Sequence, residues 1–174
     1  WKTVCLGGLL GISSLCAQAD GTGYTPAPEN LQARKEFQDG KFGIFLHWGI
    51  YSMFGQGEWY MNTDNIDCHE YAKAASGFYP SRFNAQEWVA AIKASGAKYI
   101  CITSRHHDGF SMFDTKYSDY DIVDATPFKR DVIKELAEEC RKQGIRLHLY
   151  YSHLAWTRED YYPLGRTGHG TGRT

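Results

Sequence analysis

An alternation of apolar runs with capped helical segments is the feature that most constrains how this chain of 174 residues folds. The expected elements are strands at 42–46, about 98–103 and 145–151, and helices at about 84–95 and about 131–143. A glycine follows each helix and closes it, so the turn into the next strand is short. Strands and helices that alternate in this way predict a parallel sheet, either in a doubly wound fold or in a (β/α)8 barrel.

The segment after the first strand decides between these two folds. A doubly wound nucleotide-binding fold carries a G-x-G-x-x-G loop there, whereas this chain has His47-Trp48-Gly49 and then a long loop at about 48–83. The expected fold is therefore α/β, a (β/α)8 TIM barrel. Because such barrels take about 250 residues, we expect the chain to hold about the first three βα units and to be truncated.

The first 19 residues resemble a secretory signal peptide with an incomplete start. Lys2 precedes an apolar run, and Ala17-Gln18-Ala19 forms a small-x-small cleavage pattern. Because the run is short and rich in Gly and Ser, we expect no stable membrane span and export, to the periplasm or the extracellular space, by a cleavable signal peptide. An uncleaved anchor and a lipid attached at Cys16 are the alternatives.

Two further segments are expected after the signal peptide. Residues 20–36 read as a leader, with a short helix at about 31–37. Residues 37–174 form the N-terminal part of the barrel domain, and a glycine-rich stretch at 165–174 ends the chain in mid-fold. The oligomeric state has no signature in the sequence.

The composition favours a small neutral ligand. The 19 basic and 20 acidic residues interleave to a formal charge of -1, so no basic face for nucleic acid stands out. Twelve Tyr and five Trp supply the flat amphipathic rings that line pockets for such ligands. Past the signal peptide, Cys68, Cys101 and Cys140 form neither a disulfide framework nor a zinc motif, and buried thiols are expected.

Polar, titratable side chains follow all three predicted strands. They are His47 after the first strand, His106 and His107 after the second, and Tyr150 at the end of the third. On the third strand, Tyr150 shares a face with polar residues while Tyr151 shares the other face with leucines, so Tyr150 is expected to point inward. Parallel strands deliver their carboxyl ends to one edge, which predicts a common site.

Two interpretations of the polar residues stay open at this point. Gly57-Glu58-Trp59-Tyr60 is either a surface turn or a sugar subsite, in which a carboxylate binds hydroxyls and a ring packs on C–H groups. A metal-dependent hydrolase would also use histidines, but no acidic residue is spaced to complete a ligand set with His106 and His107. We expect no metal and no cofactor.

Several of these motifs, in the same order, are similar to those of the α-L-fucosidase family of glycoside hydrolases (family 29). The resemblance covers about residues 30–174. The motifs are Lys41-Phe42-Gly43-Ile44-Phe45-Leu46-His47-Trp48-Gly49-Ile50-Tyr51-Ser52, Gly57-Glu58-Trp59-Tyr60, Ala97-Lys98-Tyr99, Arg105-His106-His107-Asp108-Gly109-Phe110 and Tyr150-Tyr151-Ser152.

The resemblance implies a retaining exo-glycosidase with a catalytic barrel that releases terminal L-fucose from a fucosylated glycan or glycoside. It also implies which residues bind fucose: His47, Glu58, His106, His107 and Tyr150 through the ring hydroxyls, and Trp59 as a pocket aromatic. The methyl group of fucose calls for an apolar wall, to which Trp48 or Phe110 is expected to contribute.

No catalytic residue is assigned in this chain. Retaining hydrolysis needs two carboxyl groups about 5 Å apart. The resemblance implies a nucleophilic Asp at the end of the fourth strand and a later acid/base residue, both beyond Thr174, so the fragment alone is expected to be inactive. Asp108, in an Asp-Gly pair, is expected to shape a turn. The alternative function is a non-catalytic fucose-binding protein.

Overall fold

The computed structural model describes residues 23–158. The predicted signal peptide and the glycine-rich stretch at 165–174 therefore lie outside the described residues. The chain divides into two units after Gln38, and each is described by itself. The elements are α1 (Pro28–Asp39), β1 (Gly43–Leu46), η1 (Ile50–Met53), α2 (Tyr60–Thr63), α3 (Cys68–Ala72), η2 (Lys73–Gly77), α4 (Ala85–Ala94), β2 (Tyr99–Arg105), α5 (Val132–Gln143) and β3 (Arg146–Tyr151).

The leader helix is longer than predicted. A helix was expected at about 31–37, and α1 begins three residues earlier, at Pro28, and ends at Asp39. Proline suits the first helical turn, because its missing N–H has no helical partner there and its φ is already helical.

The second unit contains a three-stranded parallel sheet in the order β1-β2-β3, as the sequence predicted. Ile44 of β1 lies opposite Ile100 of β2, which lies opposite Leu147 of β3. β2 continues two residues further than predicted, to Arg105, so His106 follows the strand directly. A parallel sheet of consecutive strands requires helical crossovers on one side, and α4 and α5 supply them.

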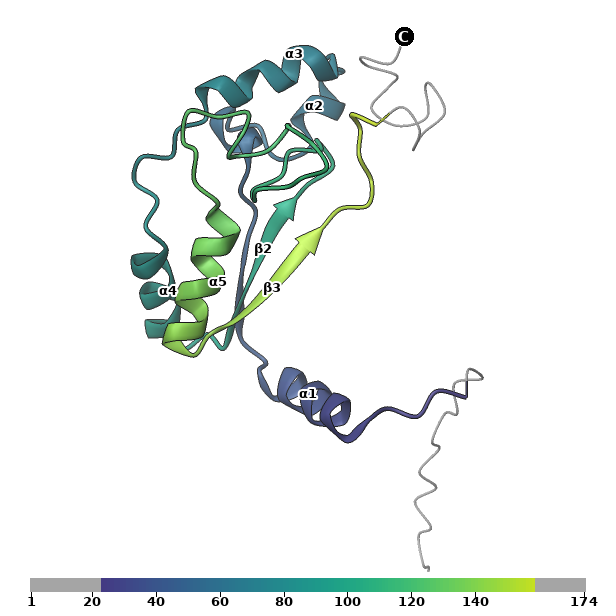
Figure 1. Ribbon diagram of the computed structural model, residues 1–174, viewed down its shortest axis with the longest axis vertical. Coiled ribbons are helices and arrows are strands. Elements are labelled where there is room, and N and C mark those ends of the chain that lie inside the picture. Colours follow the sequence, from purple (N-terminus) through teal and green to yellow (C-terminus); the bar gives the residue numbers. More distant parts are fainter. Residues whose placement is uncertain (1–22, 159–174) are drawn as a thin grey trace, which may run out of the picture. The chain divides into compact units, whose positions relative to one another are not determined.

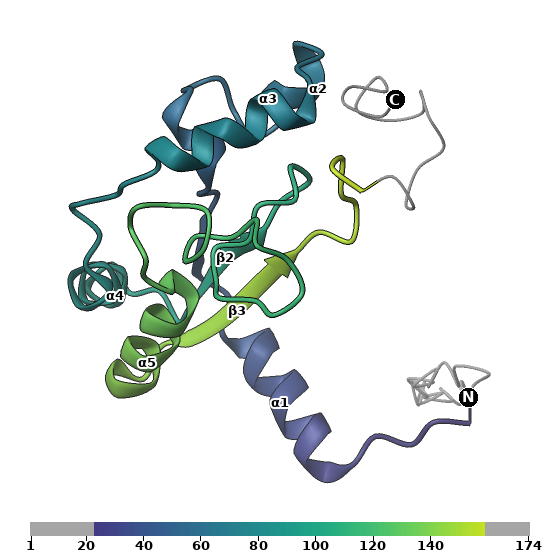
Figure 2. The ribbon, with the colours of Figure 1, turned by 45° about the horizontal axis from the view of Figure 1, so that its top comes forward.

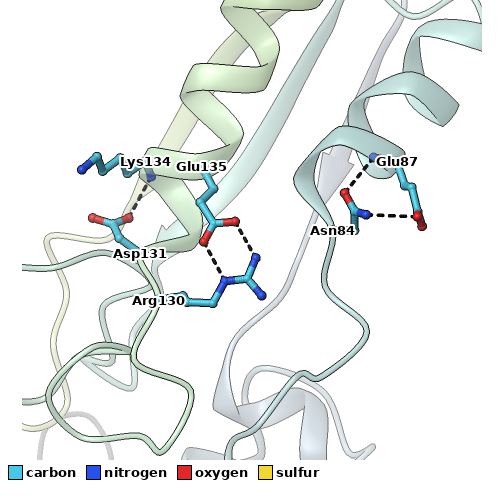
Figure 3. Close-up of polar contacts among 6 residues, drawn as sticks. All are labelled: Asn84, Glu87, Arg130, Asp131, Lys134 and Glu135. Atoms are coloured by element: carbon cyan, nitrogen blue, oxygen red, sulfur yellow. Dashed lines mark hydrogen bonds and ion pairs between the residues drawn. The ribbon is translucent and has the colours of Figure 1, made fainter.

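The crossover helices begin at the capping residues that the sequence indicated. The side chain of Asn84 accepts a hydrogen bond from Glu87 N at 3.2 Å, and its amide donates to the Glu87 carboxylate at 3.0 Å (Figure 3). Asp131 accepts from Lys134 N at 2.8 Å. These bonds satisfy backbone donors that have no partner within a helix. α5 ends at Gly144, which has φ +72 and so terminates the helix in the left-handed region.

The two helices lie side by side on one face of the sheet (Figures 1 and 2). Ile100 and Ile102 of β2 are fully buried and belong to the same core as Val89 of α4 and Leu136 of α5. Side chains alternate along a strand, so the intervening residues face the other way. That opposite face of the sheet carries Phe45, Cys101 and the other residues that lead to the strand ends.

The long loop after β1 is expected from the sequence, but it is not irregular throughout. It contains the short helices η1, α2, α3 and η2, and its Tyr51, Met61, Tyr71 and Phe78 are buried in the core. Figure 1 shows α2 and α3 at the end toward which the strands run. The loop therefore covers the edge of the sheet where the candidate residues were predicted.

Buried cysteines were expected, and their burial can be compared with the structure. Cys68 and Cys140 are buried and Cys101 is half-buried, and no disulfide joins the three cysteines. Within residues 23–158, no helix has both the length and the apolar composition needed to cross a membrane.

Candidate functional site

The structure brings four of the predicted residues together at the carboxyl ends of the strands. The ring of His106 lies 4.2 Å from that of His107 and 5.7 Å from those of His47 and Tyr150, measured between centroids. His47 and Tyr150 are themselves 6.2 Å apart. Tyr150 is on the same side of the sheet as the histidines, while Tyr151 contacts Arg105, as the alternation on β3 predicted.

A bulge at the end of β2 aligns this group. Thr103 lies opposite Tyr150 and Arg105 lies opposite Tyr151, so Ser104 is the extra residue on β2. The Ser104 hydroxyl donates a hydrogen bond to the carbonyl of Tyr150 at 2.9 Å. Bulges turn the following side chains toward a new direction. Here the bulge comes directly before His106 and His107.

Thr103 fixes the exit of β1 beside the bulge. Its Oγ1 donates to the carbonyl of Trp48 at 3.0 Å and accepts from the Trp48 N–H at 3.0 Å. Because its proton is used in this way, the 2.9 Å contact with the Tyr51 hydroxyl has Tyr51 as donor. The residue after His47 is thereby tied to β2, which holds His47 beside His106.

Glu58 joins the histidines from the loop between η1 and α2. Its carboxylate and one ring nitrogen each of His47 and His106 all lie within 4.8 Å of one another. The expectation that no acidic residue completes a set with His106 and His107 is not tested by this group, which joins Glu58 to His106 and His47 instead. Sequence spacing missed Glu58 because the loop returns to the strand ends only through tertiary packing.

Trp59 forms an aromatic corner beside the histidines. Its ring is 46 % exposed and meets the rings of His107 and Trp156 edge-on, each at 5.2 Å. Trp156 also lies 5.3 Å from His107. Trp156 follows β3 in a segment without a recognisable pattern, so no local signal in the sequence pointed to it.

The expected apolar wall is not built from Trp48 or Phe110. Trp48 packs against Trp88 at 4.9 Å and Phe83 at 5.4 Å, and Phe110 is buried in the core. The ring next to the cluster is instead that of Phe45, stacked on His47 at 4.7 Å. Phe45 precedes His47 by two residues on the same strand face, which is the signal that could have identified it.

The electrostatics keep the central histidines neutral. His106 is 4 % exposed, and burial, reinforced by the neighbouring His107, lowers the pKa of its ring to about 4. Burial also lowers the pKa of His107. A neutral imidazole offers one donor and one acceptor, so this pair is suited to hydroxyl groups, which need both.

A serine hydroxyl orients the second histidine. Nδ1 of His107 lies 2.6 Å from Oγ of Ser152, and this hydroxyl also donates to the carbonyl of Leu154 at 2.7 Å. Ser152 belongs to the segment that follows β3 and is buried. Ser152 belongs to the motif Tyr150-Tyr151-Ser152, but no role for it was predicted from the sequence.

Asp108 shapes the turn after the histidines, as predicted. Its carboxylate accepts a hydrogen bond from Phe110 N at 3.1 Å. The side chain is 1 % exposed, and burial raises its pKa to about 7 although Arg105 opposes the shift. Its other oxygen has no hydrogen-bond partner in the described residues. An acid this deeply buried is not accessible to a ligand from solvent.

A cavity of about 1010 Å³ adjoins the strand ends but is separate from the histidine group. Its lining includes Arg105, Tyr120 and Tyr151 and none of the six predicted site residues. We place the candidate site at the histidines because polar groups of matching chemistry converge there, whereas cavity volume alone carries no chemistry.

The sequence matches known proteins over nearly its whole length. The family model described as Alpha-L-fucosidase matches residues 12–172. Human plasma alpha-L-fucosidase is 35% identical over 172 residues, covering 86% of this chain and 35% of the human protein. The chain thus spans about a third of the length of this curated relative.

Solved structures give a corresponding similarity. Alpha-L-fucosidase isoenzyme 1 from Paenibacillus thiaminolyticus is 37% identical, with a TM-score of 0.76, over 80% of this chain and 33% of that one. A GH29 alpha-L-fucosidase from Bacteroides thetaiotaomicron, solved as a trapped covalent intermediate with 2-fluoro-fucosyl fluoride, is 33% identical, with a TM-score of 0.72, over 75% and 32% of the two chains.

Proposed function

This chain belongs to the α-L-fucosidase family, and on that premise we propose that its strand-end cluster is the fucose-binding part of a retaining exo-α-L-fucosidase. The observation that carries the proposal is the convergence of His47, Glu58 and His106 from three separate segments within 4.8 Å. The proposed fucose ligands are His47, Glu58, Trp59, His106, His107 and Tyr150.

The chemistry of these groups suits a deoxy sugar. The carboxylate of Glu58 accepts hydrogen bonds from sugar hydroxyls and strengthens them by its charge. The neutral ring of His106 can donate or accept, and the neutral ring of His107 accepts through Nε2, without adding charge. Trp59 offers a partly exposed ring for a C–H face, and Phe45 offers apolar surface for a methyl group.

The finer architecture belongs to the same proposal. We propose that residues 37–174 are the N-terminal part of a (β/α)8 catalytic barrel and that β1, β2 and β3 are its first three strands. The supporting observations are the parallel order of consecutive strands, the two crossover helices, and the location of the cluster at the carboxyl ends, where barrel enzymes bind substrate.

The cluster binds and orients the sugar, and the reacting carboxyl groups are supplied by other parts of the whole protein. Retention requires one carboxylate to attack the anomeric carbon and one acid to protonate the leaving oxygen. Asp108 is too buried to do either. We assign no catalytic residue within residues 23–158 and propose that both carboxyls lie in parts of the whole protein outside this chain. The trapped covalent intermediate of the Bacteroides relative supports the retaining mechanism, in which a carboxylate attacks the sugar.

Binding and turnover test the proposal separately. L-Fucose affinity is measured by calorimetry, and release of fucose from an aryl α-L-fucoside is measured with the whole protein that carries this chain. Tyr150→Phe is expected to weaken fucose binding about 3- to 10-fold, since one hydrogen bond contributes about 1 kcal/mol. Glu58→Gln is expected to weaken it about 10- to 100-fold, because a charged partner is lost.

Tyr151→Phe is the matched control. It removes the same hydroxyl from the neighbouring residue, whose side chain contacts Arg105 on the other face of the strand. Fucose affinity is expected to be unchanged in this variant. Equal effects of Tyr150→Phe and Tyr151→Phe would contradict the proposed site, and binding without turnover in the whole protein would favour a non-catalytic fucose-binding protein.

The proposal extends to export. We propose that residues 1–19 act as a cleavable signal peptide and residues 20–36 as a leader, which supports a periplasmic or extracellular enzyme. N-terminal sequencing of the mature protein tests this, with Asp20 as the expected first residue. A mature protein that retains the first 19 residues would contradict cleavage.

A further inference from the structure

The group formed by His47, Glu58 and His106 has the donor set of a transition-metal site. Two imidazole nitrogens and one carboxylate oxygen are the ligands of one common kind of zinc centre. In this protein they lie within 4.8 Å of one another. Ligand atoms around a tetrahedral Zn²⁺ ion lie about 3.4 Å apart, given bonds of about 2.0–2.2 Å. Movements that bring the ligand atoms closer by at most about 1.4 Å would therefore close the set.

The three side chains are available for such a contraction. Among the side-chain hydrogen bonds of residues 23–158 none involves His47 or Glu58, and Nδ1 of His106 is buried without a partner. His47 is exposed and Glu58 is half-buried in a loop, so both can move, while the buried His106 anchors the site. No ion pair among the described residues competes for the carboxylate of Glu58.

We propose that His47, Glu58 and His106 bind one borderline divalent transition-metal ion, such as Zn²⁺ or Cu²⁺, and that this ion excludes fucose from the same side chains. The mixed nitrogen and oxygen donors favour these ions over Mg²⁺ or Ca²⁺, which prefer oxygen ligands alone. The ion is an inhibitor rather than a cofactor. The competition with fucose rests on the proposed function, whereas metal binding itself does not.

The test is calorimetric titration of the whole protein, stripped of metal by a chelator, with ZnCl₂. Glu58→Gln and His47→Gln are each expected to weaken Zn²⁺ binding by about tenfold or more, because losing a direct ligand costs at least as much as losing an outer partner. His153→Gln removes an exposed histidine outside the cluster and is expected to leave the affinity unchanged. Equal Zn²⁺ affinities in all four proteins would overturn the proposal.

A second measurement uses the unmodified protein, so its result does not depend on whether the variants fold. Co²⁺ added to the unmodified protein is expected to show the intense visible absorption of a low-coordinate site with histidine ligands, and Zn²⁺ is expected to abolish it. Absence of this absorption, with only the weak colour of hydrated Co²⁺, would contradict a closed site independently of any substitution.

Competition experiments with L-fucose distinguish failure of the metal site from failure of the proposed fucose site. L-Fucose in excess is expected to weaken the apparent Zn²⁺ affinity, and Zn²⁺ is expected to raise the KM for an aryl α-L-fucoside without changing kcat. Cluster-dependent Zn²⁺ binding without fucose binding would support the metal site and contradict the fucose site. Fucose binding that depends on Glu58, with Zn²⁺ binding that does not, would contradict the metal site alone.

Discussion

The hydroxyl of Ser152 holds the ring of His107 in one tautomer. The hydroxyl of Ser152 has one proton and donates it to the carbonyl of Leu154, so its oxygen accepts a hydrogen bond from the N–H at Nδ1 of His107. Nδ1 therefore carries the hydrogen, and Nε2 is left as an acceptor. His107 thus presents a lone pair to a ligand, which is the correct partner for a sugar hydroxyl that donates.

Removing this hydroxyl is expected to weaken fucose binding. Ser152→Ala frees the His107 ring to change tautomer, and we expect a loss of about 3- to 10-fold in affinity, in line with one hydrogen bond. Ser152→Thr keeps the hydroxyl and is expected to retain most of the affinity. Calorimetry with L-fucose checks both variants, and a Ser152→Ala protein with unchanged affinity would contradict the role.

Asp108 is expected to make the protein less stable as the pH rises. Its pKa is about 7 in the folded protein, because burial disfavours the charge, against an ordinary value of 3.8. Between these values the folded state holds a proton that the unfolded state has lost, so the free energy of unfolding falls from about pH 4 to about pH 7. Ionisation costs the folded state on the order of 4 kcal/mol.

Asp108→Asn removes this dependence while its side-chain oxygen still accepts from Phe110 N. Relative to the unmodified protein, the variant is expected to gain stability on going from pH 4 to pH 8. Urea unfolding at a series of pH values measures the difference. Parallel stability curves for the two proteins would show that Asp108 does not titrate in this range.

His106 is expected to act in the opposite direction. Burial and the charge of His107 lower its pKa from 6.5 to about 4, so the unfolded state binds a proton between these values and the folded state does not. Stability attributable to His106 is therefore lost as the pH falls from 6.5 toward 4. NMR titration of the ring is expected to show His106 neutral at pH 5, and a midpoint near 6.5 would contradict this.

Gly109 is expected to tolerate no side chain. It has φ +78, and a Cβ there would collide with the hydroxyl of Thr157. Gly109→Ala is expected to lower the free energy of unfolding by about 1–3 kcal/mol. Gly55→Ala is the control, because Gly55 also has a positive φ of +65 but has no atom within 4 Å of the added Cβ. Equal losses in both variants would mean that the Thr157 contact costs nothing.

The helix caps are expected to contribute unequally. Asn84→Ala should cost about 1 kcal/mol of unfolding free energy, the usual value of one N-cap. Asp131→Ala should cost more, because Asp131 also accepts from Asp114 N at 3.1 Å and so ties a second loop to α5. Thermal unfolding checks the order. Lys73→Gln, which breaks an exposed ion pair with Glu70, is the control and should cost less than about 1 kcal/mol.

The sequence allowed the strands, the crossover helices and their caps to be predicted because each depends on neighbouring residues. For example, Asn84 with Glu87 caps the start of α4, and Gly144 caps the end of α5, as these local patterns predicted. The arrangement of Tyr150 followed from alternation along β3. Alternation along β1 and the residues after it puts Trp48 on the face opposite His47, in the core. Applied there, it would have shown that Trp48 does not contribute to the apolar wall expected beside the methyl group of fucose.

The rest of the site could not be predicted because it depends on tertiary packing. Glu58 reaches the histidines only after the loop that follows β1 has folded over the strand ends. Ser152 and Trp156 act on His107 across about 45 residues of chain. No local pattern records such contacts, and only a resemblance to a known family indicated that Glu58 belongs with the histidines.

The three hydrogen bonds of Thr103 bear on how the loop after β1 can change in evolution, because they hold only its first residues. Trp48 and Tyr51 are both held to β2 by this one hydroxyl, so the position of His47 is set by these bonds and not by the segment between α2 and α3. We therefore expect insertions between α2 and α3 to leave His47 in place. In homologous proteins, the segment between these helices is therefore expected to vary and to change the surroundings of the site, while the residues at the strand ends keep their positions.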